Sequence, residues 1–541
     1  MKIKIKIWAT SLTLIFTAGC AALVAAEYNP AKPNVVIILA DDMGFGDVSS
    51  NNPLARTKTP NIDALSKSGI RFTEAHAGGA TCIPSRYALL TGRYYFRAST
   101  YRDNGAKLGG VGYLPPLIEP GRETIGSLMQ KAGYATACIG KWHLGMNWEL
   151  KDPAKPAGLL NGDPESAVRY TNTDFSRGTH DGPNTRGFDY SFILPSSASD
   201  PPYVYVKNGQ VLDPDVVLIP DLYPTRQPDT VYDWDRKYVA SPGDAYWQRG
   251  VIFKNGEISR SFRIENNPRI LLDEAVSFIR RQAAAPDRRP FLLYFPLSGP
   301  HTPWMPNEPF RGRSGMGVYG DWVGQTDYLI GQVHEALVQA GIADNTLLIV
   351  TSDNGAHWGE EDVQRTAHQA NAGRRGQKAD IWDGGHHVPL IVNWPARIRE
   401  PGTYDQAVSL ADLMATFAEM TNQPLNDHCA EDSVSFYRVL QGDRTAPTRE
   451  TILYESSGGP AIVKDGWKYT AVLGSGGFTS PSVVKGVPDG ARGQLYHVAV
   501  DPYERVNLDL AEPARAAELG GLLQRQVAQG FSAPRLDGAK R

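Results

Sequence analysis

Short runs of consecutive apolar residues recur along the chain from residue 34 to residue 394. The first of them reads NVVIILA, and continuous runs of this length are typical of strands buried on both faces of a parallel sheet. Together they predict strands at residues 34–40, 70–72, 134–139, 291–295, 347–352 and 389–394.

Helical patterns lie between these runs. Thr59 followed by Pro60 is typical of a capped helix start, so a helix is predicted at residues 59–65. Further helices are predicted at residues 123–132, 270–282, 326–340 and 410–420. Strands that alternate with helices in this way indicate an α/β fold.

Two stretches depart from the alternation. Residues 151–260 are rich in Pro, Asp, Gly and aromatic residues with little helical periodicity, which predicts a long binding loop rather than a separate domain. Beyond residue 426 the pattern predicts short strands and a closing helix. These later elements are expected at residues 451–454, 461–463, 468–472, 494–498 and 512–529.

The N-terminus carries a targeting pattern. Three lysines precede an apolar run at residues 7–16, and small residues at 24–26 offer a cleavage site, so residues 1–26 are predicted to be a secretory signal. Lipid attachment at Cys20 is the alternative, although Thr17 stands where a lipoprotein signal normally has an aliphatic residue. We expect a secreted or periplasmic protein with no transmembrane span in the mature chain.

Charge and cysteine content narrow the class of protein. The 541 residues carry a formal net charge of −3, which gives no reason to expect a nucleic-acid surface. Anion recognition must therefore be local. The mature chain would keep Cys82, Cys138 and Cys429, and Cys138, in an apolar run, is expected to be a buried core thiol.

Polar residues follow two of the predicted strands directly. Asp41 and Asp42 come after the first strand, and Asp353 and Asn354 come after residues 347–352. In open α/β sheets ligands bind beyond the carboxyl ends of the strands, so these side chains are well placed to hold a hard cation. For either pair taken alone, the alternative is a solvated turn or a helix cap.

The stretch TCIPSRYALLTGR begins at residue 81. Pro84 restricts its own φ and holds Ile83 extended, so a turn should lead into a helix at residues 85–90. That helix would place Cys82 at its N-terminus, which favours an anion. A lone Cys-x-Pro would more simply be a half-buried thiol at a strand–helix turn.

The complete motif is more specific. Cys82, Pro84, Ser85 and Arg86, followed by Leu-Thr-Gly-Arg at residues 90–93, resembles the signature of the type I sulfatases, arylsulfatase-like members of the alkaline phosphatase superfamily. The resemblance extends from residue 34 to the last predicted helix. It implies a large, mixed, mostly parallel sheet flanked by helices over residues 27–425, and a smaller antiparallel sheet with a helix over residues 426–541.

In this family the cysteine is oxidised by a formylglycine-generating machinery to an aldehyde. One hydroxyl of the aldehyde hydrate attacks sulfur and expels the alcohol, and the other loses its proton, so that the aldehyde is regenerated and sulfate leaves. A serine has no second hydroxyl for that step. The residues that the resemblance makes catalytic are Cys82, Arg86, Lys141, His143, His301, Asp353 and Lys378.

Their implied roles differ. Asp353 would accept the proton of the attacking hydroxyl, His143 the second proton, and His301 with Lys378 would assist the leaving oxygen. Arg86 and Lys141 would hold the hydrate and the sulfate charge. In an extended segment Lys141 and His143 would point to the same side.

The family also implies a cation site. Its oxygen ligands favour Ca²⁺, in preference to Mg²⁺, over zinc, and no additional His/Asp set indicates the two-zinc site of related phosphatases. The implied ligands are Asp41, Asp42, the hydrated residue at Cys82, Asp353 and Asn354. Many relatives have arginine two residues beyond the Gly-Gly pair, where this chain has His387, so that arginine's structural role is in doubt.

The expected substrate is a sulfated carbohydrate, or an aryl sulfate, with sulfate released from an oligosaccharide end. Ser197 resembles a serine that related sulfatases bring near the sulfate. Aromatic residues that could stack on sugars, or could simply pack, are Tyr203, Tyr205, Trp234, Trp247 and Trp304. The alternatives are a formylglycine-dependent phosphonate or phosphate diester hydrolase and a non-catalytic sulfated-glycan binding protein.

Overall fold

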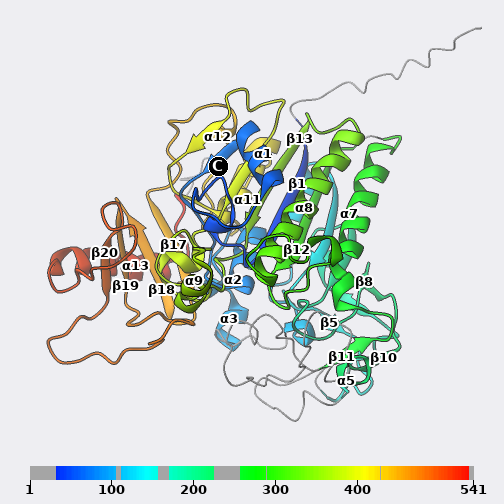
Figure 1. Cartoon of the computed structure of the whole chain (residues 1–541), viewed down its shortest axis with the longest axis horizontal. Helices are drawn as coiled ribbons and strands as arrows, with labels where there is room; N and C mark the ends of the chain where they lie inside the picture. Colours follow the sequence, from blue (N-terminus) through cyan, green and yellow to red (C-terminus); the bar gives the residue numbers. More distant parts are fainter. Residues whose placement is uncertain are drawn as a thin grey trace, which may run out of the picture.

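The structure is a computed structural model that describes residues 32–104, 111–155, 170–223, 256–287, 289–426 and 428–534. Figure 1 shows a large body of strands and helices with a small sheet at one side. The predicted signal at residues 1–26, with Cys20, lies outside the described residues, as do Trp234 and Trp247. Among the helices described, none has the length and apolar character that a membrane crossing requires.

Ten strands form the central sheet, in the order β15-β2-β14-β13-β1-β12-β4-β7-β8-β9. Neighbours from β13 to β7 are parallel, whereas β14 and β8 pair antiparallel with β13 and β7. The predicted large, mixed, mostly parallel sheet is therefore confirmed. The strands are β1 (Asn34–Asp41), β2 (Ile70–Phe72), β4 (Ala135–Lys141), β7 (Tyr190–Leu194), β8 (Val206–Lys207), β9 (Gln210–Val211), β12 (Phe291–Pro300), β13 (Thr346–Ser352), β14 (Leu390–Asn393) and β15 (Gly402–Tyr404).

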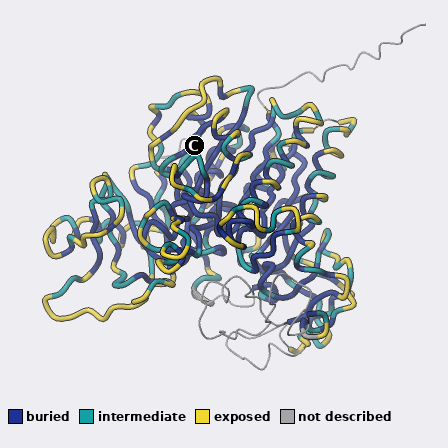
Figure 2. Tube along the Cα trace, viewed as in Figure 1, coloured by how far each residue is buried: buried dark blue, intermediate teal, exposed yellow. Residues whose placement is uncertain are grey.

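The central strand β1 is apolar throughout because both of its faces are covered. Val35, Ile37 and Leu39 enter one core cluster, and the alternate residues Val36 and Ile38 enter the other. Successive strand side chains point to opposite faces, so two cores need a continuous apolar run. Figure 2 shows these strands buried and most of the exposed residues on the outer helices and loops.

Helices supply both cores. The first cluster includes residues of α2 (Cys82–Thr91), α4 (Ile125–Lys131) and α11 (Leu413–Thr421), and the second includes residues of α1 (Pro60–Ser68), α7 (Asn267–Ala283) and α8 (Val318–Gln339). The other α-helices in the described part of the chain are α3 (Ser99–Asn104), α5 (Ile219–Leu222), α9 (Glu360–Thr366), α10 (Asp383–His386), α12 (Tyr437–Leu440) and α13 (Pro513–Gln529).

Two expectations need correction. Residues 151–260 are not an insertion outside the sheet, because β7, β8 and β9 extend it there. The helix expected at residue 326 begins at Val318, since the buried Tyr319 and Trp322 add an earlier apolar face. Two-residue and three-residue strands outside the main sheet are β3 (Ala75–His76), β5 (Asn147–Trp148), β6 (Thr179–Asp181), β10 (Val216–Leu218), β11 (Glu257–Ser259) and β16 (Val408–Ser409).

The small sheet is antiparallel, as expected. Its strands are β17 (Thr451–Ser456), β18 (Gly459–Lys464), β19 (Trp467–Thr470) and β20 (Gln494–His497). Helix α13 packs on it through Leu519 and Leu523, which share a core cluster with Leu453 and with Ala88 of α2. The small sheet therefore contacts the helix that begins at Cys82. The domain boundary at residue 425 stays a prediction.

Candidate active site

Three neighbouring strands bring their carboxyl ends together at one edge of the central sheet. Strand β1 ends at Asp41, β12 ends just before His301, and β13 ends just before Asp353. The backbone N–H of Asp42 donates to Asp353 Oδ1 at 3.1 Å, which ties the turn after β1 to the turn after β13. Asp42 has φ 63°, a left-handed conformation that turns the chain sharply after the strand.

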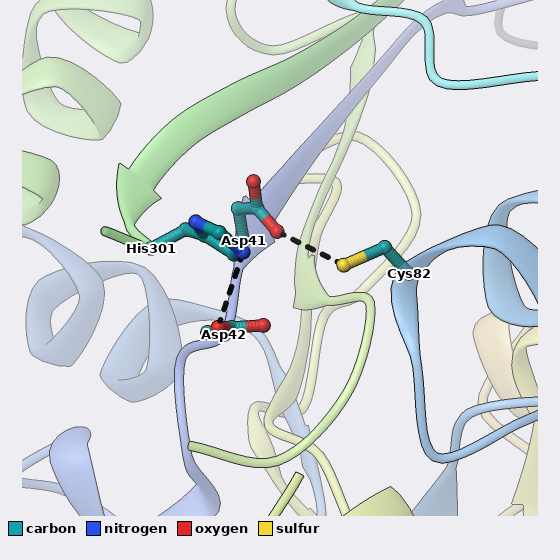
Figure 3. A group of neighbouring side chains, drawn as sticks. All are labelled: Asp41, Asp42, Cys82 and His301. Atoms are coloured by element: carbon teal, nitrogen blue, oxygen red, sulfur yellow. Dashed lines mark hydrogen bonds and ion pairs between the residues drawn. The ribbon is translucent and has the colours of Figure 1, made fainter. Parts of the chain in front are cut away.

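Cys82 faces this edge as the first residue of α2, so the predicted position at a helix N-terminus is confirmed. Its Sγ lies 3.6 Å from Asp41 Oδ1 and 3.4 Å from Lys378 Nζ. Figure 3 shows Cys82 pointing at Asp41 from the opposite side of the group. Burial and the nearby Asp353 carboxylate raise the pKa of the thiol to about 12 against the opposing effect of Lys141, so the unmodified thiol is protonated at neutral pH.

Arg86 lies one turn further along α2 and is fully buried. Its Nη2 and Nε donate to Asp353 Oδ2 at 2.7 and 3.0 Å, and Nη1 donates to the Lys141 carbonyl at 3.0 Å. Although burial alone would lower the pKa of Arg86, the Asp353 and Asp41 carboxylates raise it above its ordinary value. Arg86 is therefore a fixed cation that joins α2, β4 and the end of β13.

Two lysines neutralise the remaining carboxylates. Lys141 Nζ donates to Asp41 Oδ2 at 2.7 Å, and Lys378 Nζ donates to Asp42 Oδ2 at 2.8 Å. Burial would raise the pKa of Asp41, but Lys141, His301 and Arg86 outweigh it and lower the pKa to about 2. The carboxylate of Asp41 thus stays ionised although it is buried.

Asn354 supplies an unpartnered oxygen to this group. Its Nδ2 donates to Asp42 Oδ1 at 2.7 Å and to the Gly355 carbonyl, whereas its Oδ1 is buried with no hydrogen-bond partner. A buried amide oxygen without a donor is costly unless a cation or a water molecule satisfies it. Carboxylate and amide oxygens are the ligands of hard cations, so the residues present fit a calcium ion.

Two histidines flank the group. His301 places Nε2 3.7 Å from Asp42 Oδ2, its Nδ1 lies 2.7 Å from the Thr302 carbonyl, and its own carbonyl accepts from Trp322 Nε1. Burial and Lys378 lower the pKa of His301, partly opposed by Asp42. This imidazole is therefore neutral more readily than an ordinary histidine, and can exchange a proton at Nε2.

His143 follows β4, and its Nδ1 is buried without a hydrogen-bond partner. Burial and the nearby cations Lys141 and Arg86 lower its pKa well below the ordinary value. The expected extended geometry is wrong at this point, because β4 ends at Lys141 and His143 has φ 57°. The tertiary structure nevertheless keeps His143 within electrostatic range of Lys141, Arg86 and His301.

The structure thus brings together ten of the eleven predicted site residues, all except Ser197. Asp41, Asp42, Cys82 and His301 each offer one possible metal ligand atom within 4.8 Å of the others, a set that includes His301 where the sequence indicated Asp353 (Figure 3).

The ten predicted residues that meet at this sheet edge are Asp41, Asp42, Cys82, Arg86, Lys141, His143, His301, Asp353, Asn354 and Lys378. Ser197 is the predicted residue that stays apart. Its hydroxyl pairs with Ser199 and Asp200, and in the described part of the chain no hydrogen bond or ion pair joins it to the group.

The aromatic candidates are mostly packing residues. Tyr203 and Trp304 are buried in the second core cluster, and Tyr205 is half-buried with its ring centroid 4.7 Å from that of Phe262. None of the three presents a free aromatic face here, so the packing alternative holds for them. Tyr203 and Tyr205, the two described candidates from residues 151–260, therefore contribute their rings to this core.

His387, which stands where many relatives have arginine, is buried beside Thr73 and Phe45. Its Nε2 lies 2.9 Å from the Thr73 carbonyl, and its ring packs edge-on against Phe45. Arg374 contacts Glu74 at 3.3 Å and Asp383 at 3.1 Å. A cation from a neighbouring segment, Arg374, therefore pairs with the two carboxylates beside His387.

Comparisons with known proteins agree with this geometry. The family model described as Sulfatase matches residues 33–423. The chain is 31% identical over 530 residues to the N-acetylgalactosamine-6-O-sulfatase of Bacteroides thetaiotaomicron, covering 94% of this chain and 96% of that protein. It is 32% identical over 447 residues to human arylsulfatase G, covering 79% of this chain and 72% of that one.

A solved structure named for the metabolism of multiple glycosaminoglycans by Bacteroides thetaiotaomicron superposes with a TM-score of 0.74 at 28% identity, covering 92% of this chain and 100% of that one. The family model spans more than half of the chain and includes all ten residues of the group. The chain therefore belongs to the sulfatase family, among its arylsulfatase-like members, and is a sulfuric ester hydrolase.

Proposed function

We propose that this sulfatase removes sulfate from carbohydrates outside the cytoplasm, with formylglycine formed from Cys82 and with a bound calcium ion. The observation that carries the proposal is the position of Cys82 at the N-terminus of α2, with Asp41 on one side of its Sγ and Lys378 on the other. The modification would replace Sγ, so that Cβ of residue 82 would carry the two hydroxyl groups of the hydrated aldehyde in place of the sulfur.

The hydrated aldehyde would supply an oxygen nucleophile for sulfur and a second hydroxyl whose deprotonation releases sulfate. The proposed proton acceptor for the first hydroxyl is Asp353, whose Oδ2 Arg86 holds in place by two hydrogen bonds. His143 would accept the second proton, because its Nδ1 has no hydrogen-bond partner and its lowered pKa keeps the ring neutral.

The leaving alcohol departs from the side of the ester's sulfur atom that is opposite the nucleophile, and it needs a proton there. The protonated form of His301 is the proposed donor at Nε2, since its Nδ1 proton faces the Thr302 carbonyl, and Lys378 would stabilise the charge on the same oxygen. Lys141 and Arg86 would hold the sulfate oxygens and restrain the nucleophile. Their buried charges need no reorganisation when charge develops, which is how fixed cations lower such a barrier.

Calcium is the cation that the donor set supports best. The ligands would be Asp41, Asp42, Asn354 and the modified residue 82, with Asp353 or His301 as a further ligand. The unpartnered Asn354 Oδ1 is the feature that supports this assignment over a purely ion-paired cluster. Bound there, the ion would withdraw charge from the sulfate and orient it.

A carbohydrate substrate is supported by the name of the Bacteroides relative, an N-acetylgalactosamine-6-O-sulfatase. The net charge of −3 offers no broad cationic track for a long sulfated polymer, so we favour release from an oligosaccharide end. The predicted signal at residues 1–26 supports secretion or a periplasmic location, with lipid attachment at Cys20 as a variant of the same proposal.

Two measurements test the proposal. The mass of the peptide that contains Cys82, from protein made in a host with a formylglycine-generating enzyme, should be that of the aldehyde, and a free thiol in fully active protein would exclude this route. Sulfated oligosaccharides with defined ends should release sulfate from the end residue first. Activity confined to small aryl sulfates, or first loss of internal sulfate, would contradict the proposed substrate.

A further inference from the structure

We propose that Gln377, His357 and Phe478 form a subsite for the sugar that carries the sulfate, in which Gln377 accepts a hydrogen bond from a hydroxyl and Phe478 contacts the ring face. The inference rests on the proposed carbohydrate substrate. It assigns a role to a loop of the small sheet, because Phe478 lies beyond the residues 33–423 that match the family model.

Gln377 has a buried acceptor without a donor. Its side chain is 9% exposed, and its Oε1 has no hydrogen-bond partner in the structure. The orientation of the amide follows from its neighbour. The Thr479 hydroxyl donates to Asp380 Oδ2 at 2.5 Å, so Thr479 Oγ1 can only accept from Gln377 Nε2, which lies 3.3 Å away.

The unpartnered atom is therefore the amide oxygen Oε1, and it needs a hydrogen-bond donor. Gln377 directly precedes Lys378, whose Nζ lies 3.4 Å from Cys82 Sγ. A substrate held at Cys82 by its sulfate would bring the neighbouring hydroxyl groups of its sugar close to the segment that carries Gln377 and Lys378. A sugar hydroxyl is a donor of the required kind, and a buried polar group that finds its partner only in the complex favours substrates with that hydroxyl.

Phe478 presents an apolar ring in the same place. It is 54% exposed, whereas large apolar side chains are usually buried, and its ring centroid lies 4.9 Å from that of His357. Its loop is fixed to the strand-end segment: Thr479 N–H donates to Asp380 Oδ1 at 3.0 Å. A Cβ at Gly477 would lie 2.2 Å from the Ala379 carbonyl oxygen, so only glycine permits this close approach.

His357 connects the aromatic pair to the cation site. It follows Asn354 by three residues, and the Lys378 N–H donates to the carbonyl of the intervening Ala356 at 3.1 Å. The segments that carry Asn354 and Lys378 are therefore joined by a backbone hydrogen bond at the residue next to His357. Aromatic faces beside a few convergent polar groups are typical of sites that bind small organic ligands, and a pyranose ring offers an apolar face of suitable size.

The test compares substrate turnover with sulfate binding. Gln377→Leu removes the acceptor and keeps the volume, and Phe478→Ala removes the ring. For a sulfated oligosaccharide that the wild type hydrolyses, each variant should lower kcat/KM about tenfold, the effect of about 1.4 kcal/mol in the transition state. The inhibition constant of inorganic sulfate, which has no sugar, should change by less than about twofold.

Tyr328→Ala is the matched control, because Tyr328 is an exposed aromatic residue on α8, 42% exposed, and it should leave both quantities unchanged. Phe478→Leu keeps an apolar side chain in case the alanine variant folds poorly, and it should still lose activity on the sugar. Unchanged kcat/KM in Gln377→Leu and Phe478→Leu would overturn the subsite while leaving the proposed function intact. Equal weakening of sulfate inhibition would also overturn it, and a wild type inactive on all sulfated sugars would overturn the substrate proposal itself.

Discussion

Glu455 offers a test of how the small sheet supports the active-site loop. It lies on β17 and is 3% exposed; its Oε1 accepts from the Phe96 N–H at 3.1 Å, and its carbonyl accepts from the Ala80 N–H at 2.7 Å, two residues before Cys82. Burial raises the pKa of the Glu455 carboxyl from 4.5 to about 8, despite the opposing effects of the Phe96 N–H and Arg97.

The sign of the pH dependence follows from this shift. Below pH 4.5 the carboxyl is protonated in both states and contributes nothing to the dependence. Between pH 4.5 and about 8 the unfolded chain releases the proton and the folded protein retains it, so the free energy of unfolding falls as pH rises. At 1.36 kcal/mol per pKa unit, the total effect is about 5 kcal/mol, of which about 3 to 4 kcal/mol develops between pH 5 and pH 8.

Glu455→Gln removes the titration and keeps an oxygen acceptor for the Phe96 N–H. Its stability relative to wild type should therefore rise by about 3 kcal/mol from pH 5 to pH 8, measured by urea unfolding at a series of pH values. The control is Glu518→Gln, since Glu518 is an exposed partner of Arg515 with 52% side-chain exposure, and it should run parallel to wild type. If the Glu455→Gln and wild-type curves also run parallel, the carboxyl is ionised in the folded protein and the reasoning is wrong.

Three further predictions concern the reaction. Cys82→Ala should abolish turnover with an unchanged melting temperature, and Cys82→Ser should stop after one turnover because it has no second hydroxyl; sustained turnover by the serine variant would rule out the route. His301→Ala should lose about 10²-fold or more on esters with poor leaving groups and much less on aryl sulfates, and equal losses would remove its role as leaving-group acid. Chelation with EGTA should abolish activity, and Ca²⁺ should restore it at a higher concentration in Asn354→Ala than in wild type; restoration of both proteins at the same Ca²⁺ concentration would remove Asn354 from the ligand set.

The order of strands and helices was predictable because it depends on local patterns. The run at residues 34–40 must be apolar on both faces to enter two cores, and β1 does so. The Cys82 motif and the polar residues at two strand ends were equally visible, since they stand together in the sequence. By contrast β7 was missed, because its strand pattern is short and lies in a stretch rich in turn-forming residues.

The pairing of the site residues was decided by the tertiary structure alone. Arg86 and Asp353 are 267 positions apart, and Asn354 and Asp42 are 312 apart, so no local pattern indicates which carboxylate meets which cation. The unpartnered oxygens of Asn354 and Gln377 are likewise invisible in the sequence, because satisfaction of a polar group depends on all the atoms around it. The sequence by itself determined the family, the candidate nucleophile and the strands that converge on it, whereas the packing of distant segments determined which charges are paired and which buried acceptors have no partner.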